Sequence, residues 1–389
     1  MKKIMIFLVM ILLLNLNGVC SALENPPKEN ETQPLPNSAA YILVENSTGK
    51  VLAQSNANER LSPASLTKIM LLLLIAEEIN AGRLSMSDSV TASSHASSMD
   101  GSVIWLNQGE IMSVADLVKA VVMSSANDAA VALAEHIGGN EEGFVTLMNQ
   151  KAYVLGMSGT NFVNAVGYDH PEHYTTAQDV ATMARALMRE ANYSLFAGDM
   201  LTRLCSVRTG TEREAQLVNT NRLINYYNGI EGIKTGTTDK AGYCLAAAAT
   251  RSDIRLISVV MGAKDDDDRL ELSETLLDYG FANYELYSDF DMTFDEIPLT
   301  GGVDNYVELE LNTPEAIVIP KGRAGDIESE IYLPQRVTAP VAKNQPIGTV
   351  TATLDGEVVY EGYITASRTF GELTFFRVAT FLVKRFFGI

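Results

Sequence analysis

Three short motifs bring together residue types that can carry out acyl transfer. In the first, Ser65 and Lys68 stand three residues apart at the start of an apolar run, residues 69–76. The run is apolar nearly all round, which predicts a buried helix, and on a helix residues three apart are neighbours. A buried lysine amine beside a serine hydroxyl is a suitable base for a serine nucleophile. Taken alone the motif is weak, because roughly one such spacing per chain of this length arises by chance.

A second motif, Ser125-Ala126-Asn127, stands at a break between two predicted helices. Side chains at such a break are able to project into a cleft. Serine and asparagine are also common turn residues, so the triplet taken alone is more typical of an ordinary turn between two helices. Its meaning therefore depends on the rest of the chain.

The third motif, Lys234-Thr235-Gly236 with Thr237 beside it, falls on a predicted strand. The glycine allows a ligand to approach the backbone closely. A Lys-Thr-Gly triplet arises by chance at roughly one in several thousand positions, so this motif is far more specific than the other two. The three motifs, in this order on a helix, a loop and a strand, predict one catalytic cleft.

The elements that must position these motifs follow from the hydrophobic pattern. Two apolar segments joined by a turn predict a β-hairpin over 40–44 and 50–53. Loops with short strands are expected over 83–112. Capping residues and helical spacing then predict a helical region, with helices at about 113–122, 128–137 and 141–155 and a fourth after Thr176. Strands at 231–238, 243–250 and 254–263 are expected to form an antiparallel meander joined to the hairpin.

The last third of the chain changes in character. Four aspartates at 265–268 precede a predicted helix from 269 to about 284. They are consistent with a cation site, but acidic residues at a helix N-terminus more often serve to stabilise it. A domain boundary is expected near 285–292. Short strands then predict a small all-β domain with a spacer or adaptor role, at 307–311, 316–319, 328–333 and 350–354.

The N-terminus carries an export feature. Lys2 and Lys3, the apolar residues 4–14 and the small residues at 20–22 predict a signal peptide over residues 1–22 that is cleaved after Ala22. The alternatives are an uncleaved membrane anchor or, less favoured, a lipid on Cys20. A proline-bearing linker over residues 23–38 separates the signal from the fold.

The C-terminus is amphipathic at helical spacing over residues 371–389. Its phenylalanines share one face, and its basic residues lie largely opposite them. This pattern suits a helix that lies in the plane of an anionic membrane surface, and the alternative is a helix packed on its own β-domain. Together with the signal, it predicts an exported protein held peripherally at the outer face of the cytoplasmic membrane.

Composition excludes several other classes of function. The net charge of −19 disfavours nucleic acid as a partner. The four histidines show no zinc-ligand spacing, so we expect neither a metal nor another cofactor. Two cysteines remain after the signal, Cys205 and Cys244, too few for a disulfide framework. A buried Cys244 thiol is favoured, and a bridge to Cys205 stays open.

The motif set occurs in penicillin-binding proteins and β-lactamases. The sequence resembles the D-alanyl-D-alanine carboxypeptidases among the low-molecular-weight penicillin-binding proteins, also in Ile233 before the Lys-Thr-Gly, in residues 241–243 and in residues 173–177. One departure is Ala126, where many relatives carry glycine. The resemblance implies an α/β (α+β) domain of the serine β-lactamase and penicillin-binding-protein type over 39–287, with an antiparallel sheet and a helical subdomain. A small β-domain over 288–370 and the amphipathic tail helix complete it.

The resemblance also implies a role for each motif residue. Ser65 would attack the penultimate D-alanine carbonyl of a peptidoglycan stem pentapeptide, Lys68 would take the proton, and Ser125 would pass it to the leaving amine. The substrate-binding residues would be Asn127, Lys234, Thr235, Gly236 and Thr237. The backbone N–H groups of Ser65 and Thr237 would form the oxyanion hole. β-Lactam antibiotics would then be inhibitors.

Two other functions are weighed against this one. A β-lactamase of class A would add a glutamate that activates the deacylating water, and no clear equivalent stands between Ser125 and Lys234; Glu172 lacks the asparagine that normally accompanies it. A non-catalytic β-lactam or muropeptide sensor usually needs a spanning helix to an intracellular partner, and the sequence offers none.

Overall fold

The computed structural model of the chain describes residues 40–288, 296–312, 316–375 and 379. The predicted signal peptide (1–22), the linker (23–38) and most of the predicted tail helix lie outside these residues. Within them, no helix is both long enough and apolar enough to cross a bilayer.

A five-stranded antiparallel sheet lies at the centre of the larger domain, in the order β2-β1-β9-β8-β7. Its strands are β1 (Ala40–Glu45), β2 (Val51–Ser55), β7 (Ile230–Thr238), β8 (Gly242–Arg251) and β9 (Ile254–Ala263). The predicted hairpin and meander are confirmed, and they join through β1 and β9, where Ala40 lies opposite Met261. β7, which carries the Lys-Thr-Gly motif, is left as an edge strand.

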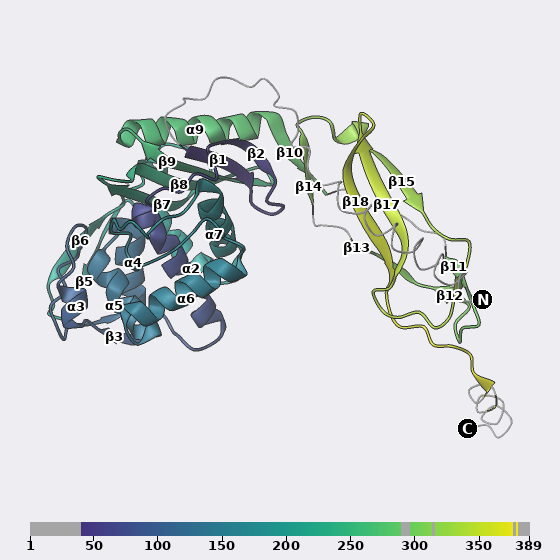
Figure 1. Cartoon of the computed structure of the whole chain (residues 1–389), viewed down its shortest axis with the longest axis horizontal. Helices are drawn as coiled ribbons and strands as arrows, with labels where there is room; N and C mark the ends of the chain where they lie inside the picture. The colour runs from purple at the N-terminus through teal and green to yellow at the C-terminus, as the bar shows by residue number, and fades with distance from the viewer. Residues whose placement is uncertain (1–39, 289–295, 313–315, 376–378, 380–389) are drawn as a thin grey trace, which may run out of the picture. The chain divides into compact units, whose positions relative to one another are not determined.

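Helices cover both faces of this sheet, with α9 on one side and the helical region on the other (Figure 1). The helices are α2 (Thr67–Asn80), α4 (Val114–Ser124), α5 (Asn127–Gly138), α6 (Glu141–Val154), α7 (Ala177–Arg189), α8 (Ser194–Leu201) and α9 (Asp266–Asn283). Because α2 is enclosed by its neighbours, residues 69–73 are fully buried. The all-round apolar pattern of that run is explained by this position.

Capping side chains begin the helices where the sequence predicts them. The Ser113 hydroxyl accepts the Asp116 N–H at 3.1 Å, and the Thr176 hydroxyl accepts the Asp179 N–H at 3.0 Å. At the acidic run the Asp265 carboxylate accepts the Asp268 N–H at 2.8 Å, so the first aspartate caps α9. Among the described residues no cluster of histidine, cysteine, aspartate and glutamate could hold a metal ion.

The short strands expected over 83–112 are present as β3 (Ser89–Thr91) and β4 (Ile111–Ser113), which pair with each other. Other short elements carry no sequence signal of their own: α3 (Ser94–Ser97), α8, β5 (Leu204–Arg208) and β6 (Glu214–Val218), with short 3₁₀ turns at Arg222–Asn225 and Ala324–Asp326. β5 and β6 form a separate hairpin. These elements are stabilised by tertiary contacts rather than by periodicity, which is why the sequence does not reveal them.

The described residues after α9 form mainly β-strands. β10 (Tyr284–Tyr287) pairs with β14 (Ile317–Pro320), so the strand predicted at 316–319 exists but does not join the main sheet of the small domain. That sheet has the order β13-β18-β17-β15, with β13 (Leu309–Asn312), β15 (Glu328–Tyr332), β17 (Pro346–Leu354) and β18 (Glu357–Ala366). A three-stranded sheet comprises β11 (Ile297–Thr300), β12 (Tyr306–Val307) and β16 (Val337–Thr338).

The open question about the cysteines is answered by this fold. Both Cys205 and Cys244 are free thiols, so no bridge joins them, and Cys244 is buried on β8 as favoured. Of the predicted tail helix, residues 376–378 and 380–389 lie outside the described residues; Phe375 is 81% exposed.

Candidate active site

The nucleophile motif lies in a tight turn rather than in the first α-helical turn. Ser65 belongs to a 3₁₀ turn, Ala64–Leu66, directly before α2, and Ala64 has the left-handed backbone angle φ +47°. Two glycines approach this turn from other elements. A Cβ on Gly167 would lie 1.8 Å from the Ala64 carbonyl oxygen, and one on Gly236 would lie 2.9 Å from the Ser65 nitrogen. Only glycine fits at these two contacts, which seat the Ser65 turn against β7 at Gly236 and against a second loop at Gly167.

Lys68 is completely buried and faces the nucleophile. Its Nζ donates to Ser65 Oγ at 2.9 Å, to Asn127 Oδ1 at 2.7 Å and to the Val166 carbonyl oxygen at 3.0 Å. Burial lowers the pKa of Lys68 well below its usual value, the positive charge of Lys234 lowers it further, and Asp128 opposes the shift. When neutral, the amine keeps two N–H donors for Asn127 and Val166, and its lone pair can face Ser65 Oγ and take the proton.

The Ser-x-Asn motif occupies the turn between α4 and α5. Ser125 ends α4 in the left-handed region with φ +59°, and its buried Oγ has no hydrogen-bond partner among the described residues. Asn127 begins α5, and its amide nitrogen donates to the Asp100 carbonyl at 2.7 Å while its oxygen holds Lys68. The turn thus presents the Ser125 hydroxyl, which is able to bond to a substrate, and the Asn127 amide, whose position is set by its hydrogen bonds.

The Lys-Thr-Gly motif lies on β7, the edge strand of the sheet. Lys234 is 1% exposed and donates from Nζ to the Thr235 carbonyl at 3.0 Å. Burial, reinforced by the charge of Arg269, lowers its pKa to about 7. The Thr235 hydroxyl lies 2.6 Å from that of Thr220. The structure therefore brings all eight predicted site residues to one place, around the Ser65 turn and the β7 edge.

Arg269, on the first turn of α9, is a site residue that the sequence reasoning missed. It is 6% exposed, and one guanidinium nitrogen donates to the carbonyl oxygens of Gly236 and Cys244 and to Thr237 Oγ1, each at 3.1 Å. It also pairs with Asp266. Its place directly after four aspartates made it resemble part of a helix cap. The structure shows a second buried cation behind the Lys-Thr-Gly strand.

A loop over residues 164–169 contacts the first two motifs and the end of β7, and no sequence pattern marks it. Its Val166 carbonyl holds Lys68, and Gly167 packs on the nucleophile turn. Tyr168 Oη donates to the Asp100 carboxylate at 2.6 Å. At the opposite wall, the carboxylate of Asp169 accepts the Thr238 hydroxyl at 2.8 Å. Residues 168 and 169 therefore tie the loop that carries Asp100 to the end of β7.

His173 supports the start of α2, directly after the nucleophile turn. Its Nδ1 accepts the Val163 N–H at 3.0 Å, so Nε2 carries the proton and donates to the Thr67 hydroxyl at 2.9 Å. Burial lowers its pKa to about 4, which keeps the ring neutral at physiological pH.

Acid is expected to destabilise the protein through His173. The unfolded histidine has a pKa near 6.5 and binds more protons than the folded one between about pH 6.5 and pH 4. The stabilisation is therefore fully present above pH 6.5 and is lost as pH falls through 4, up to roughly 3 kcal/mol. Urea unfolding of wild type and His173→Gln at pH 7 and pH 4.5 measures this. A variant that loses as much stability in acid as wild type would contradict it, and His136→Gln is the control.

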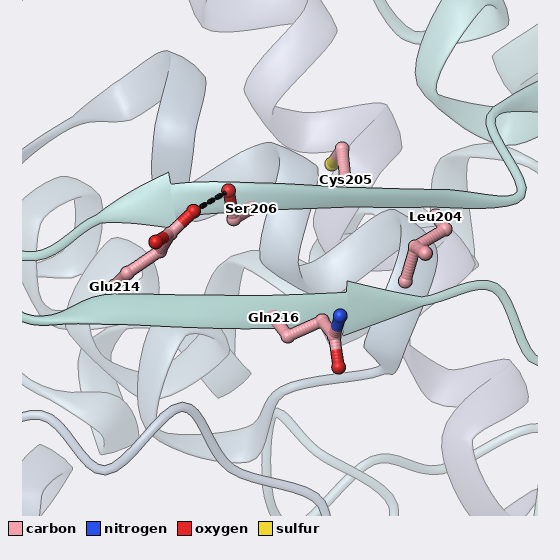
Figure 2. A pocket seen from close by; sticks show the side chains of 5 residues that line it. All are labelled: Leu204, Cys205, Ser206, Glu214 and Gln216. Atoms are coloured by element: carbon pink, nitrogen blue, oxygen red, sulfur yellow. Dashed lines mark hydrogen bonds between the residues drawn. The ribbon is translucent and has the colours of Figure 1, made fainter.

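A pocket of about 410 Å³ lies elsewhere, on the β5–β6 hairpin, lined by Leu204, Cys205, Ser206, Glu214 and Gln216. Figure 2 shows these side chains on the two strands, with the Ser206 hydroxyl bonded to Glu214. Cys205 Sγ lies 3.2 Å from Met123 Sδ, and burial raises the pKa of the thiol. None of the motif residues lines this pocket, so it is separate from the catalytic cleft.

Two family profiles match this chain, one for each of its folded parts. The family profile described as D-alanyl-D-alanine carboxypeptidase matches residues 28–265. The profile described as penicillin-binding protein 5, C-terminal domain, matches residues 281–372. The second match covers the all-β region that follows α9.

Individual relatives span nearly the whole chain. The D-alanyl-D-alanine carboxypeptidase DacF of Bacillus subtilis is 40% identical over 352 residues, covering 86% of this chain and 90% of DacF. DacC of Escherichia coli is 35% identical, covering 91% of this chain and 89% of DacC. The structure of penicillin-binding protein 5 from Haemophilus influenzae superposes with a TM-score of 0.80 at 33% identity, over 88% of this chain and 100% of that one. This chain belongs to the D-alanyl-D-alanine carboxypeptidase family of low-molecular-weight penicillin-binding proteins.

Proposed function

We propose that this chain is a serine-type D-Ala-D-Ala carboxypeptidase that removes the terminal D-alanine from peptidoglycan stem pentapeptides. The observation that carries the proposal is the 2.9 Å hydrogen bond between Lys68 Nζ and Ser65 Oγ, made by a lysine that is wholly buried. A serine hydroxyl becomes a nucleophile when an adjacent base takes its proton. The relatives named above carry the same activity in their names.

The acylation step follows from these positions. Ser65 Oγ bonds to the carbonyl carbon of the penultimate D-alanine while its proton moves to Lys68. The amide C–N bond then breaks, and the proton reaches the leaving amine through Ser125, whose hydroxyl is buried and without a partner among the described residues. Water hydrolyses the resulting ester and frees the shortened peptide.

The substrate's terminal carboxylate suits the β7 edge. Lys234 supplies a cation, and the hydroxyls of Thr235 and Thr237 supply donors. Arg269 donates a hydrogen bond to the Thr237 hydroxyl and fixes its orientation. The edge strand β7 therefore offers the carboxylate a positively charged environment and oriented hydroxyl groups. A bound carboxylate would favour the protonated form of Lys234. The Ser65 N–H beside Gly236 suits one arm of the oxyanion hole.

β-Lactams are expected to acylate Ser65 and to stay bound. In the described structure the three partners of Lys68 Nζ are a hydroxyl, an amide oxygen and a main-chain carbonyl, none of them a carboxylate. Glu172, the acidic residue weighed for a deacylating role, is exposed to solvent. A relative, penicillin-binding protein D2 of Listeria monocytogenes, 30% identical with a TM-score of 0.57 over 64% of this chain, is known in an ampicillin-bound form. Slow deacylation makes penicillin an inhibitor here.

One experiment separates the three candidate functions. Purified protein is given a peptide ending in D-Ala-D-Ala, and D-alanine is measured; a parallel sample is given benzylpenicillin, and its hydrolysis is followed. We expect D-alanine release and a penicilloyl adduct that persists for many turnovers of the peptide. Rapid hydrolysis of benzylpenicillin would instead identify a β-lactamase. Acylation by penicillin with no release of D-alanine would identify a sensor.

We also propose that the protein is exported and held at the outer face of the cytoplasmic membrane by its C-terminus. The signal-like residues 1–22 and the amphipathic residues 371–389 support this, as does the exposure of Phe375. Deletion of residues 375–389 is expected to move the processed protein from the membrane pellet to the soluble fraction, with unchanged activity on a soluble peptide. Continued pelleting of the truncated, processed protein would reject the anchor.

A further inference from the structure

The chain's only tryptophan, Trp105, is held with its side chain 72% exposed. The residues on either side of it are buried: Ile104 is 2% exposed and Leu106 is 4% exposed. The two neighbours anchor the segment in the core and leave the indole between them facing outward. A large aromatic side chain that stays in water forgoes a substantial hydrophobic gain.

The backbone around Trp105 is fixed from both sides. Trp105 has the left-handed angle φ +56°. The Asp128 carboxylate, itself 1% exposed, accepts the N–H groups of Ile104 at 3.1 Å and Leu106 at 3.0 Å. Arg213 donates to the carbonyl oxygens of Ile104 at 2.6 Å and Trp105 at 2.8 Å. A non-glycine residue in this conformation costs about 1–3 kcal/mol, and such strain is found mainly at sites that bind or react.

The segment that carries Trp105 is hydrogen-bonded to the start of α5, where the Ser-x-Asn motif ends. Asp128, which fixes the neighbours of Trp105, directly follows Asn127. The Asn127 N–H donates to the Ser102 carbonyl at 2.6 Å, three residues before Trp105. The same short segment therefore holds the amide that positions Lys68 and presents the tryptophan. Trp105 is therefore three residues from a backbone contact with Asn127, which is itself a partner of Lys68.

The chemistry of the segment indicates a neutral ligand. Residues 101–109 contain no charged side chain, in a chain whose net charge is −19. Within this segment, the exposed polar side chains are those of Ser102, Asn107 and Gln108, which are uncharged donors and acceptors. A flat apolar surface flanked by hydroxyl and amide groups matches a sugar ring, which has an apolar face and a rim of hydroxyl and acetamido groups.

We propose that Trp105 is a stacking platform for an N-acetylated sugar of the glycan that carries the stem peptide. The inference rests on the proposed function, since it takes the substrate to be a peptidoglycan stem. A pentapeptide in extended conformation spans at most about 17 Å, so the sugar at its far end stays close to the cleft while the D-Ala-D-Ala end is at Ser65. The enzyme then recognises its substrate at both ends, by charge at β7 and by stacking at Trp105.

Because the chain has a single tryptophan, its fluorescence reports on this platform directly. The Ser65→Ala variant is titrated with a disaccharide-pentapeptide, with the same pentapeptide without sugar, and with the N-acetylglucosaminyl-N-acetylmuramic acid disaccharide alone. We expect the emission to shift to the blue with both sugar-bearing ligands and to stay unchanged with the bare peptide. The proposal would be overturned if the emission maximum did not shift on addition of the disaccharide-pentapeptide, or if the bare peptide shifted it equally.

Kinetics provide the second arm. We compare kcat/KM for the disaccharide-pentapeptide with kcat/KM for the bare pentapeptide. In Trp105→Ala the ratio of the first to the second is expected to fall about tenfold, through a higher KM for the sugar-bearing substrate. Trp105→Phe should restore part of this ratio. Tyr153→Ala removes an aromatic side chain that is 88% exposed on α6 and should leave the ratio unchanged. An equal loss on both substrates would overturn the proposal. If wild type releases no D-alanine from either peptide, the proposed function fails, while the fluorescence titration still decides on the sugar platform.

Discussion

Replacing Ser65 with alanine is expected to lower D-alanine release by at least about 10⁴-fold, because removal of a nucleophile leaves only binding and oxyanion stabilisation. The same variant should take up no covalent fluorescent penicillin, as no ester can form. Both are measured on purified protein, by D-alanine assay and by gel fluorescence. The control is Ser94→Ala, which removes an exposed hydroxyl on α3 and should change neither result.

One outcome would relocate the nucleophile. Ser125 also offers a buried hydroxyl without a partner in the described part of the chain. Covalent labelling that survives in Ser65→Ala and disappears in Ser125→Ala would make Ser125 the nucleophile and would contradict the assignment of Ser65. We expect the opposite order: Ser125→Ala should still label, more slowly, because it affects the proton path rather than the bond that forms.

Replacing Lys68 with arginine is expected to lower kcat/KM by roughly 10³-fold, the scale of a lost general base. Arginine is always protonated, so it keeps the positive charge and loses the ability to take the Ser65 proton. Thermal unfolding shows whether the larger guanidinium has disturbed the core. Lys264→Arg, at a side chain that is 71% exposed, is the matched control. Activity within threefold of wild type, in a folded Lys68→Arg protein, would exclude Lys68 as the base.

The pH profile of the wild-type enzyme tests the same assignment. Burial and the nearby Lys234 hold the pKa of Lys68 well below its usual value, so kcat/KM should rise with pH as the amine becomes neutral. Above about pH 7 Lys234 begins to lose its proton, and KM for the anionic substrate should increase. Lys234→Arg keeps a fixed charge and should flatten that increase. A KM that rises equally in both proteins would assign the alkaline change to another group.

The sequence predicts those residues of the site that act through their side chains within a motif and not those that act through their backbone. Ser65, Asn127 and Lys234 act through side chains, so their types and order carry the prediction. The hairpin and the meander were also predictable, because apolar segments separated by turns have few ways to pair. The cleft could therefore be inferred before any coordinates were known.

The parts that were missed act through the backbone or through tertiary contacts. The 164–169 loop holds Lys68 with a carbonyl, and every residue type has one. Arg269 looked like part of a capped helix, because its contact with Gly236 lies across 33 positions of chain. The turn that strains Ala64 depends on two glycines from distant segments. Such features follow from packing and leave no local pattern to find.

The Val166 carbonyl has a consequence for how this protein is able to change under antibiotic selection. A point mutation replaces a side chain and leaves the main chain in place, so no substitution at position 166 deletes the oxygen that holds Lys68. This contact of the Val166 carbonyl with Lys68 can be lost only by moving the 164–169 loop, which is also tied to Asp100 and to Thr238. Escape from β-lactams through this loop would therefore require several concerted substitutions, and single-step variants are expected to arise elsewhere in the cleft.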